Sequence, residues 1–175
     1  QIVVAVILLI SADVPFRQLH PLRLQRATMR IPASNTSLRV SNEVARYVAA
    51  LDSITAAAGF RRGDAMLDFT GRFPTALYLI DARAIGLGWL AGGYPGSTNV
   101  ISAGLDRVPG DRLRQAWVLA EPNGPRHVPA ELLARYGLDL ARDYDVVGTL
   151  RSPMGEYLYR RDQLVYRSRA LSRTR

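Results

Sequence analysis

The sequence lacks cysteine altogether and contains only two histidines, which limits the chemistry that the chain can carry. Without cysteine there is neither a disulfide scaffold nor a thiolate metal site. His20 and His127 lie far apart in the chain, and neither has a second ligand at a spacing typical of zinc sites. The composition therefore predicts no metal site and no cofactor.

Lysine is also absent, so all 23 basic side chains are arginines, against 15 acidic ones. Residues 1–40 carry five arginines and one acid, residues 157–175 carry six arginines and one acid, and residues 41–156 carry twelve arginines and thirteen acids. A nucleic-acid-binding domain usually carries its positive charge on the folded face that docks. A neutral middle with basic ends therefore indicates a partner other than nucleic acid. It also predicts a basic tail over residues 163–175 that can lie on an anionic surface.

Long hydrophobic runs are scarce. The longest, IVVAVILLI at residues 2–10, is about half the length of a membrane-spanning helix. Two interpretations remain open: residues 1–12 are the end of a transmembrane helix, or they form a buried β-strand, which their β-branched content favours. The following residues 13–40 contain prolines and no long periodicity, which predicts a basic linker. Four arginines of this linker can pair with anionic lipid headgroups: Arg17, Arg23, Arg26 and Arg30.

Residues 41–162 show the periodicities of a folded domain. Apolar residues at three- and four-residue steps after Ser41, a favourable N-cap, predict a helix that ends at Gly59. The remaining expected elements are strand 64–70, helix 75–82, a helix capped by Ser97 that runs through Leu105, strand 115–121, helix 130–136 and a hairpin of residues 144–151 with 156–162. This order predicts an α/β fold, a layered domain with a mixed β-sheet flanked by helices and a C-terminal antiparallel hairpin.

The stretch DFTGRFPTALYLI, residues 68–80, has the composition of a strand, a glycine turn and a helix that starts at a proline. Such a corner can bind a phosphate through free helix amides, here Thr70, Gly71 and Arg72. Neither GxGxxG nor GxxxxGK[ST] occurs at the turn, however, which favours a purely architectural corner. Asp68 is expected to accept hydrogen bonds from the amides of the turn.

The glycine-rich stretch IGLGWLAGGYPGS, residues 85–97, contains two aromatic residues that are candidate binding residues. Trp89 and Tyr94 can stack on a sugar or lie at a lipid interface, although packing against the core is the more frequent role of such side chains. Ser97 and Ser102 have no histidine at a spacing that supports a hydrolase triad. No pair of acids stands out as an acid/base couple, and no catalytic residue is predicted.

Several of these segments together resemble a known family. GDAMLDFTGRFP, WLAGGYPGS, AWVLAEP and LARYGLDLARDYDVVGTLRSP are similar to the C-terminal soluble domain of multi-spanning bacterial glycosyltransferases of the GT-C type. These are aminoarabinose-transferase-like enzymes that use polyprenyl-phosphate-linked sugars. The resemblance covers about residues 41–160, and its motifs are moderately specific.

This resemblance implies an extracytoplasmic domain of the cell envelope, beside a transmembrane catalytic core in the same polypeptide. The catalytic acids of the family lie in loops that this chain does not contain, so the domain is expected to bind or orient an acceptor glycan, a polyprenyl phosphate or an anionic lipid. The arginines after the apolar run do not fit this extracytoplasmic location, because basic residues beside a membrane span favour the cytoplasmic face.

Two alternatives remain. The chain is a free-standing soluble α/β protein that binds a phosphorylated small ligand at residues 70–72, or a basic protein that binds a membrane surface or nucleic acid through its two ends.

Overall fold

The computed structural model describes residues 2–13, 25–32, 34, 36–71, 75–88, 90–153 and 161–174. Their elements follow in the order α1 (Ile2–Asp13), β1 (Ala27–Arg30), β2 (Ser37–Val40), α2 (Asn42–Ala57), β3 (Ala65–Phe69), α3 (Thr75–Leu79), β4 (Arg83–Ala84), α4 (Ser97–Leu105), α5 (Gly110–Gln115), β5 (Trp117–Ala120), α6 (Ala130–Ala134), α7 (Leu140–Asp143), β6 (Tyr144–Arg151), β7 (Asp162–Ser168) and α8 (Arg169–Thr174).

Five of the strands form one mixed sheet in the order β4-β3-β5-β7-β6. Strand β3 pairs in parallel with β4 and with β5, whereas β7 is antiparallel to both β5 and β6. Strands β1 and β2 form a separate antiparallel pair. The predicted α/β fold with a mixed sheet and a C-terminal antiparallel pair is therefore confirmed.

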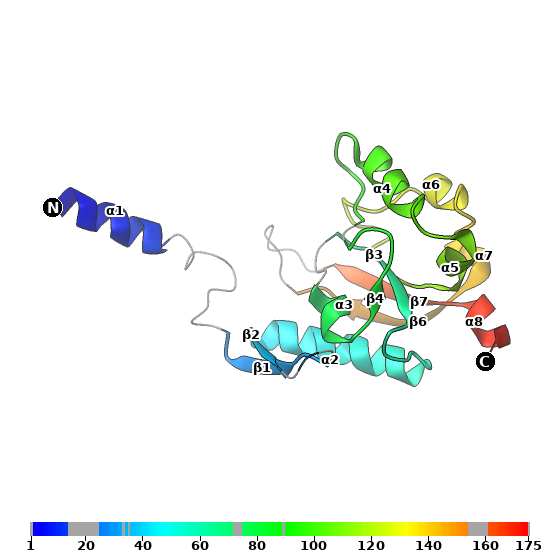
Figure 1. The fold of residues 1–175 in the computed structure, drawn as a ribbon, viewed down its shortest axis with the longest axis horizontal. Coiled ribbons are helices and arrows are strands. Elements are labelled where there is room, and N and C mark those ends of the chain that lie inside the picture. Colours follow the sequence, from blue (N-terminus) through cyan, green and yellow to red (C-terminus); the bar gives the residue numbers. More distant parts are fainter. Residues whose placement is uncertain are drawn as a thin grey trace.

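Helices cover both faces of the sheet (Figure 1). One core cluster packs α2, α3 and the β1–β2 pair against alternate residues of the strands, such as Met66 of β3 and Trp117 of β5. The second packs α4, α5 and α6 against the other alternate residues, such as Leu67 and Val118. Because successive side chains of a strand point to opposite faces, short apolar strands such as β3 and β5 supply both cores.

Helix α2 follows its sequence closely. The Ser41 hydroxyl accepts a hydrogen bond from the Val44 amide at 3.2 Å, which confirms the expected N-cap, and Gly59 adopts a left-handed conformation (φ 88°) just past the helix. Two other helix boundaries differ from expectation. Helix α3 ends before residue 82, where Asp81 takes a positive φ of 58°. Ser97 is the first residue of α4, and the cap position belongs to Gly96.

The expected basic linker is wrong for its second half, because Ala27–Arg30 and Ser37–Val40 form the β1–β2 pair. In both strands half-buried and exposed residues alternate. Met29, Leu38 and Val40 pack against the α2 core, so this part of the chain gains stability from burial that a linker would not provide.

The expected tail over residues 163–175 is also wrong. Of the second hairpin strand, expected over residues 156–162, the last residue, Asp162, begins β7. The partner of β6 is β7, which occupies a central position in the sheet, with Gln163 and Val165 fully buried. The start of the expected strand, residues 156–160, lies outside the described residues.

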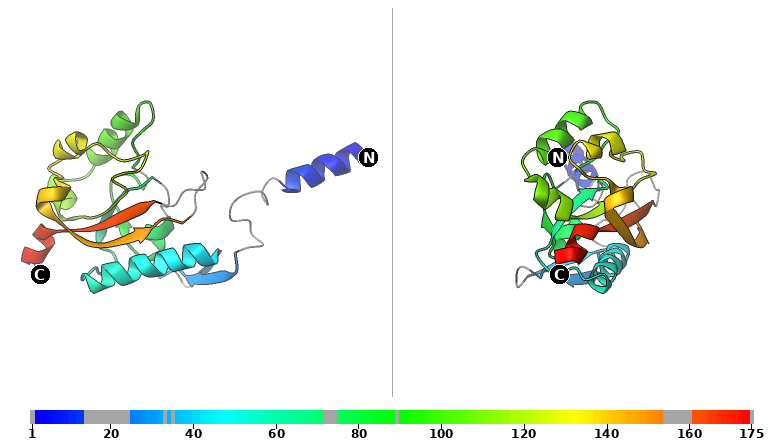
Figure 2. Two further views of the ribbon diagram at one scale, coloured as in Figure 1. Left: turned by 180° about the vertical axis from the view of Figure 1, so that it is seen from behind. Right: turned by 90° about the vertical axis from the view of Figure 1, so that its right-hand side faces the viewer.

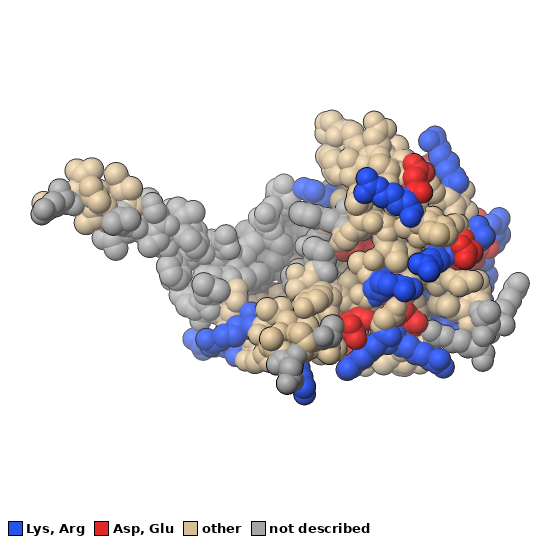
Figure 3. Space-filling model, viewed as in Figure 1, with Lys and Arg blue, Asp and Glu red and all other residues tan. Residues whose placement is uncertain are grey.

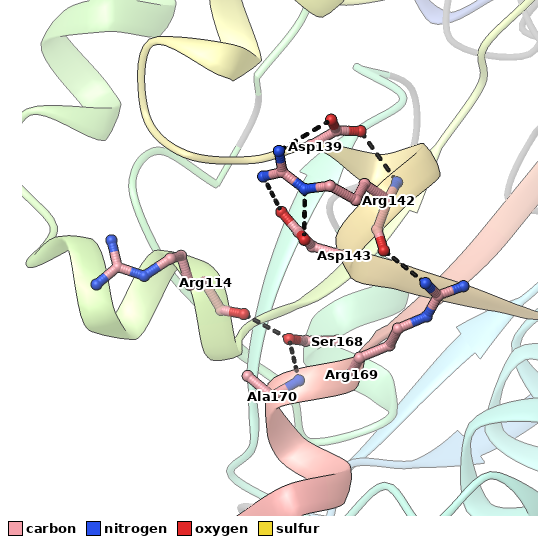
Figure 4. A network of polar contacts seen from close by, with 7 residues as sticks. All are labelled: Arg114, Asp139, Arg142, Asp143, Ser168, Arg169 and Ala170. Atoms are coloured by element: carbon pink, nitrogen blue, oxygen red, sulfur yellow. Dashed lines mark hydrogen bonds and ion pairs between the residues drawn. The ribbon is translucent and has the colours of Figure 1, made fainter.

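Polar contacts fix the chain where β7 passes into α8 (Figure 4). Ser168 donates a hydrogen bond to the Arg114 carbonyl, and Arg169 bonds both the Arg142 carbonyl and Asp145. Arg142 in turn pairs with Asp139 and Asp143. Strand pairing and these contacts together explain why so basic a segment is ordered.

Helix α1 stands apart from the α/β body in Figure 1 and in the left view of Figure 2. The run expected as a helix end or as a strand is helical, and its described side chains are exposed, from 82% for Ile2 to 47% for Val6. None of these described side chains belongs to either core cluster. Among the described residues, no helix has the length and apolar character needed to cross a membrane.

Candidate functional site

A topological switch point lies between β3 and β5. These two strands are parallel neighbours, but the helix after β3, α3, packs in the α2 core, whereas the helix after β5, α6, packs in the opposite core. The two connections therefore leave the sheet edge on opposite sides. In open α/β sheets the crevice that results at the carboxyl ends of such strands is the usual ligand site.

Two buried acids mark this edge. Asp68 is the penultimate residue of β3 and is 1% exposed; Glu121 directly follows β5 and is 3% exposed. Each acid lies two residues after a side chain that points to the α2 face of the sheet, Met66 and Leu119. Because side chains alternate between the two faces, both acids are directed to the α2 face as well.

The Asp68 carboxylate has two unlike oxygens. Oδ1 accepts hydrogen bonds from the Thr70 amide at 2.8 Å and from the Thr70 hydroxyl at 2.6 Å. Oδ2 is buried and has no hydrogen-bond partner among the described residues. The expectation that turn amides bond Asp68 is confirmed, but for one oxygen of the carboxylate only.

Glu121 ends a chain of buried hydrogen bonds that begins on α2. The Tyr47 hydroxyl donates to Gln163 Oε1 at 2.6 Å, and Gln163 Nε2 donates to Glu121 Oε2 at 3.3 Å. The register explains this contact, since Ala120 pairs with Leu164 and the next residues along the two strands are Glu121 and Gln163.

The electrostatics of the two acids are coupled. Burial raises the pKa of Asp68, the Thr70 and Gly71 backbone amides and the Thr70 hydroxyl counteract it, and the charge of Glu121 raises it further. Burial also raises the pKa of Tyr47, and Asp68 and Glu121 add to that shift, so the phenol stays protonated and acts as a donor. Among the described residues no arginine contributes to the Asp68 shift.

An open groove of about 870 Å³ reaches this edge of the sheet from the other face. Its walls are mainly apolar and include Phe69, Ala120 and Leu133, and Glu121 also lines it. This volume lies within the usual range for small-molecule sites. A side chain on Gly124 would collide with the Glu121 carboxylate, so glycine is needed there to keep that side chain in place.

The glycine-rich loop packs by its backbone. The Gly92 amide donates to the Arg126 carbonyl at 2.9 Å, and a Cβ on Gly92 or Gly93 would collide with the carbonyl of His127 or Pro125. The sequence hints at such close approach, since consecutive glycines allow two backbones to meet. The loop therefore holds the segment that follows Glu121.

Those residues predicted to bind ligand that the structure describes do not converge on one surface. Thr70 and Gly71 are buried at the crevice, whereas Tyr94 is 41% exposed on the glycine-rich loop. Arg72 and Trp89 lie outside the described residues. The Thr70 amide and hydroxyl already donate to Asp68, and two carboxylates lie beside them, so this geometry is unfavourable for a phosphate.

Sequence reasoning missed the acid pair and its partners Tyr47 and Gln163. A signal existed, because DFT and AEP each place an acid at the end of an apolar strand, and parallel strands end at the same edge. Within the described ranges no group of three His, Cys, Asp or Glu side chains could hold a metal ion.

Comparison of the chain with protein-family models, with curated proteins and with solved structures finds no match. The fold and its site thus define a three-layer α/β domain with a buried acidic crevice at its switch point.

Proposed function

We propose that this chain is an accessory domain of a membrane-embedded glycosyltransferase that uses a lipid-linked sugar donor. In this role it binds or orients an acceptor or a lipid and breaks no bond itself. The observation that carries the membrane part is α1, an apolar helix whose described side chains are exposed while the α/β body has its own two cores. An exposed apolar surface of this kind commonly marks contact with a membrane or another protein.

The distribution of charge supports the same proposal. In Figure 3 arginine and acidic side chains are interspersed over the visible face of the body, whereas the described part of α1 shows none. The sequence of α1 contains no charge before Asp13. A charged body joined to an uncharged apolar helix suits a domain held at a bilayer, in which the body stays in water.

The assignment to a glycosyltransferase is supported by the resemblance of residues 41–160 to the soluble domain of GT-C enzymes. It leads to a specific expectation about the size of the native polypeptide.

An antibody against the α/β body should detect, in membranes of the source cells, a band far larger than the 19.3 kDa of this chain. Those membranes should transfer sugar from a polyprenyl-phosphate donor, and deletion of the coding region of the body should abolish that transfer. A native band of 19 kDa in the supernatant after centrifugation would contradict the proposal.

Membrane attachment through α1 has its own test. The full chain should float with phosphatidylcholine vesicles in a density gradient, and Val4→Asp with Ile7→Asp should abolish flotation, since a charged residue in the hydrocarbon region costs about 3 kcal/mol. Tyr78→Asp with Val100→Asp, which adds the same two charges at exposed sites of the body, is the matched control and should still float.

A further inference from the structure

The groove of about 870 Å³ lies on the face of the sheet that carries the second core cluster. Its walls come from α6, α7 and the segments that lead into these helices. Its floor consists of strand side chains, which include Phe69 of β3, Ala120 of β5, Tyr166 of β7 and Tyr144 of β6. The groove is thus built on elements of the packed body, as pre-formed small-molecule sites usually are.

Three of the floor residues are aromatic. Phe69, Tyr144 and Tyr166 are 2%, 3% and 8% exposed. The Tyr144 hydroxyl donates a hydrogen bond to the Leu113 carbonyl at 3.2 Å, so this residue contributes apolar surface to the groove. Aromatic side chains prefer other flat rings as neighbours, in offset-stacked or edge-to-face contacts. The floor therefore favours a ligand that contains an aromatic ring.

The Tyr166 hydroxyl supplies a hydrogen-bond donor in this apolar setting. It has no hydrogen-bond partner among the described residues, and it is not one of the buried unpartnered atoms, so it contacts solvent. Burial raises the pKa of Tyr166, so the phenol is protonated at neutral pH and can donate. A ring with one polar group suits this arrangement. A sugar suits it less well, because most of its hydroxyls would lose water without gaining a partner in a mainly apolar groove.

The charged side chains of the groove disfavour an anion. Glu121, Glu131 and Asp139 line it, whereas the described lining contains no arginine and a single histidine, His127. These acids do not require a cation either. Glu121 already accepts the hydrogen bond that ends the buried chain from α2. Asp139 pairs with Arg142, and Glu131 is exposed to water. A further negative charge beside the three acids would be repelled, so the lining selects an uncharged ligand.

We propose that this groove binds an uncharged aromatic molecule with one hydrogen-bond acceptor, whose ring packs on Phe69, Tyr144 and Tyr166 and whose polar group accepts from the Tyr166 hydroxyl. The volume of about 870 Å³ suits a molecule of drug-like size. This inference does not depend on membrane attachment or on the glycosyltransferase assignment. A chain that fails to float with vesicles can still bind such a molecule, so the two proposals fail separately.

The test uses benzyl alcohol as the probe and the full chain in detergent micelles. Methyl NMR shifts of Leu133 and Val146, which line the groove, should change saturably at millimolar benzyl alcohol. Those of Leu51, in the other core cluster, should stay constant. Benzoate, which has the same ring and nearly the same size but a negative charge, should leave all of these shifts unchanged.

Two substitutions connect the shifts with the groove. Ala134→Trp places an indole at a lining position of α6 and should abolish binding. Ala103→Trp, at an exposed alanine of α4 that does not line the groove, is the matched control and should bind as the unaltered chain does. Tyr166→Phe keeps the ring and removes the hydroxyl, so it should weaken binding about fivefold, the loss expected for one neutral hydrogen bond.

Three kinds of result would overturn the proposal. Benzoate shifts of the same size and affinity would show that the acids do not select the ligand. Unchanged affinity in folded Ala134→Trp would show that the probe binds elsewhere, and unchanged affinity in Tyr166→Phe would show that its hydroxyl is not the donor; either result is sufficient. Saturable shifts with methyl β-glucoside, in the absence of any with benzyl alcohol, would identify a glycan site.

Discussion

Acidic side chains occur in two contrasting settings in this molecule. Asp139 and Asp143 lie on the surface and pair with Arg142 (Figure 4). Asp145, also exposed, pairs with Arg169. Asp68 and Glu121 lie buried at the edge of the sheet, where the described contacts come from Thr70, Gln163 and backbone amides.

The pKa shifts of the two settings run in opposite directions. A hydrogen bond from Arg142 lowers the pKa of Asp143, although that carboxyl is in water. Burial raises the pKa of Asp68. Surface acids are thus paired with arginines where pairing contributes little, whereas Asp68 keeps one buried oxygen without a hydrogen-bond partner among the described residues. Such an imbalance is typical of a site kept for binding at a cost in stability.

The largest effect is expected from Gln163→Leu. This change removes the acceptor of Tyr47 and a donor to Glu121 together, so two buried polar groups lose a partner. The free energy of unfolding should fall by about 2–6 kcal/mol, from roughly 1–3 kcal/mol for each group. Urea denaturation followed by circular dichroism measures it. Tyr47→Phe, which removes only the first bond, should cost less than half as much. Equal losses would mean that Gln163 acts through packing and not through the relay.

Asp68→Asn is expected to act in the opposite direction. An amide cannot ionise, so the substitution removes a buried charge that no arginine among the described residues compensates. At neutral pH it should stabilise the protein by about 1–2 kcal/mol, since an uncompensated buried carboxylate is costlier than a buried amide. Thermal unfolding of both chains at the same pH measures this. A clear loss of stability would show that the carboxylate is compensated, and the contrast between the two settings would disappear.

The pH dependence of stability sharpens the same contrast. The folded-state pKa of Asp68 is raised above its ordinary value of 3.8, so the folded protein holds this proton more tightly than the unfolded chain does. Its contribution to stability is therefore present below 3.8 and is lost as the pH rises through the folded-state pKa. The difference in stability between Asp68→Asn and the unaltered chain should grow from about pH 4 towards pH 7 in urea titrations. A difference independent of pH would exclude ionisation of Asp68 as its cause.

The smallest effect is expected from Asp143→Asn in the surface network. Its partner Arg142 is 72% exposed, so the ion pair is screened by solvent. The unfolding midpoint should change less than in any variant above. The change should disappear in about 1 M sodium chloride, where the screening length is roughly 3 Å. A change as large as that of Gln163→Leu would show that the network, and not the buried relay, dominates stability.

Helices and strands that depend mainly on the residue pattern within their own segment could be predicted from the sequence. Helix α2 has an N-cap, an apolar face and a terminal glycine, and β3 and β5 are short apolar runs between turn residues. Strand β7 was missed because the arginines of residues 163–175 suggested a solvated tail. Its burial depends on pairing with β5 and β6, which lie far away in the sequence. The β1–β2 pair was missed although its alternation is visible in the sequence, because each strand has only four residues.

The candidate site was harder to predict than the fold. Asp68 was recognised with its turn partners, but its pairing with Glu121 depends on two strands being parallel neighbours. Tyr47 and Gln163 come from a helix and from the missed strand, so their contact, 116 residues apart, left no local signal. The glycine-rich stretch was noted for the binding candidates Trp89 and Tyr94, whereas the structure shows Gly92 and Gly93 in close backbone packing.

The position of β7 in the sheet has a consequence for synthesis of the chain. Strands β5 and β6 are made before it, yet neither has its antiparallel partner until residues 162–168 have left the ribosome. Until then, one side of β5 is an open edge of the kind that pairs with other chains. A nascent chain that stalls before Ser168 should therefore be a substrate for chaperones and proteases.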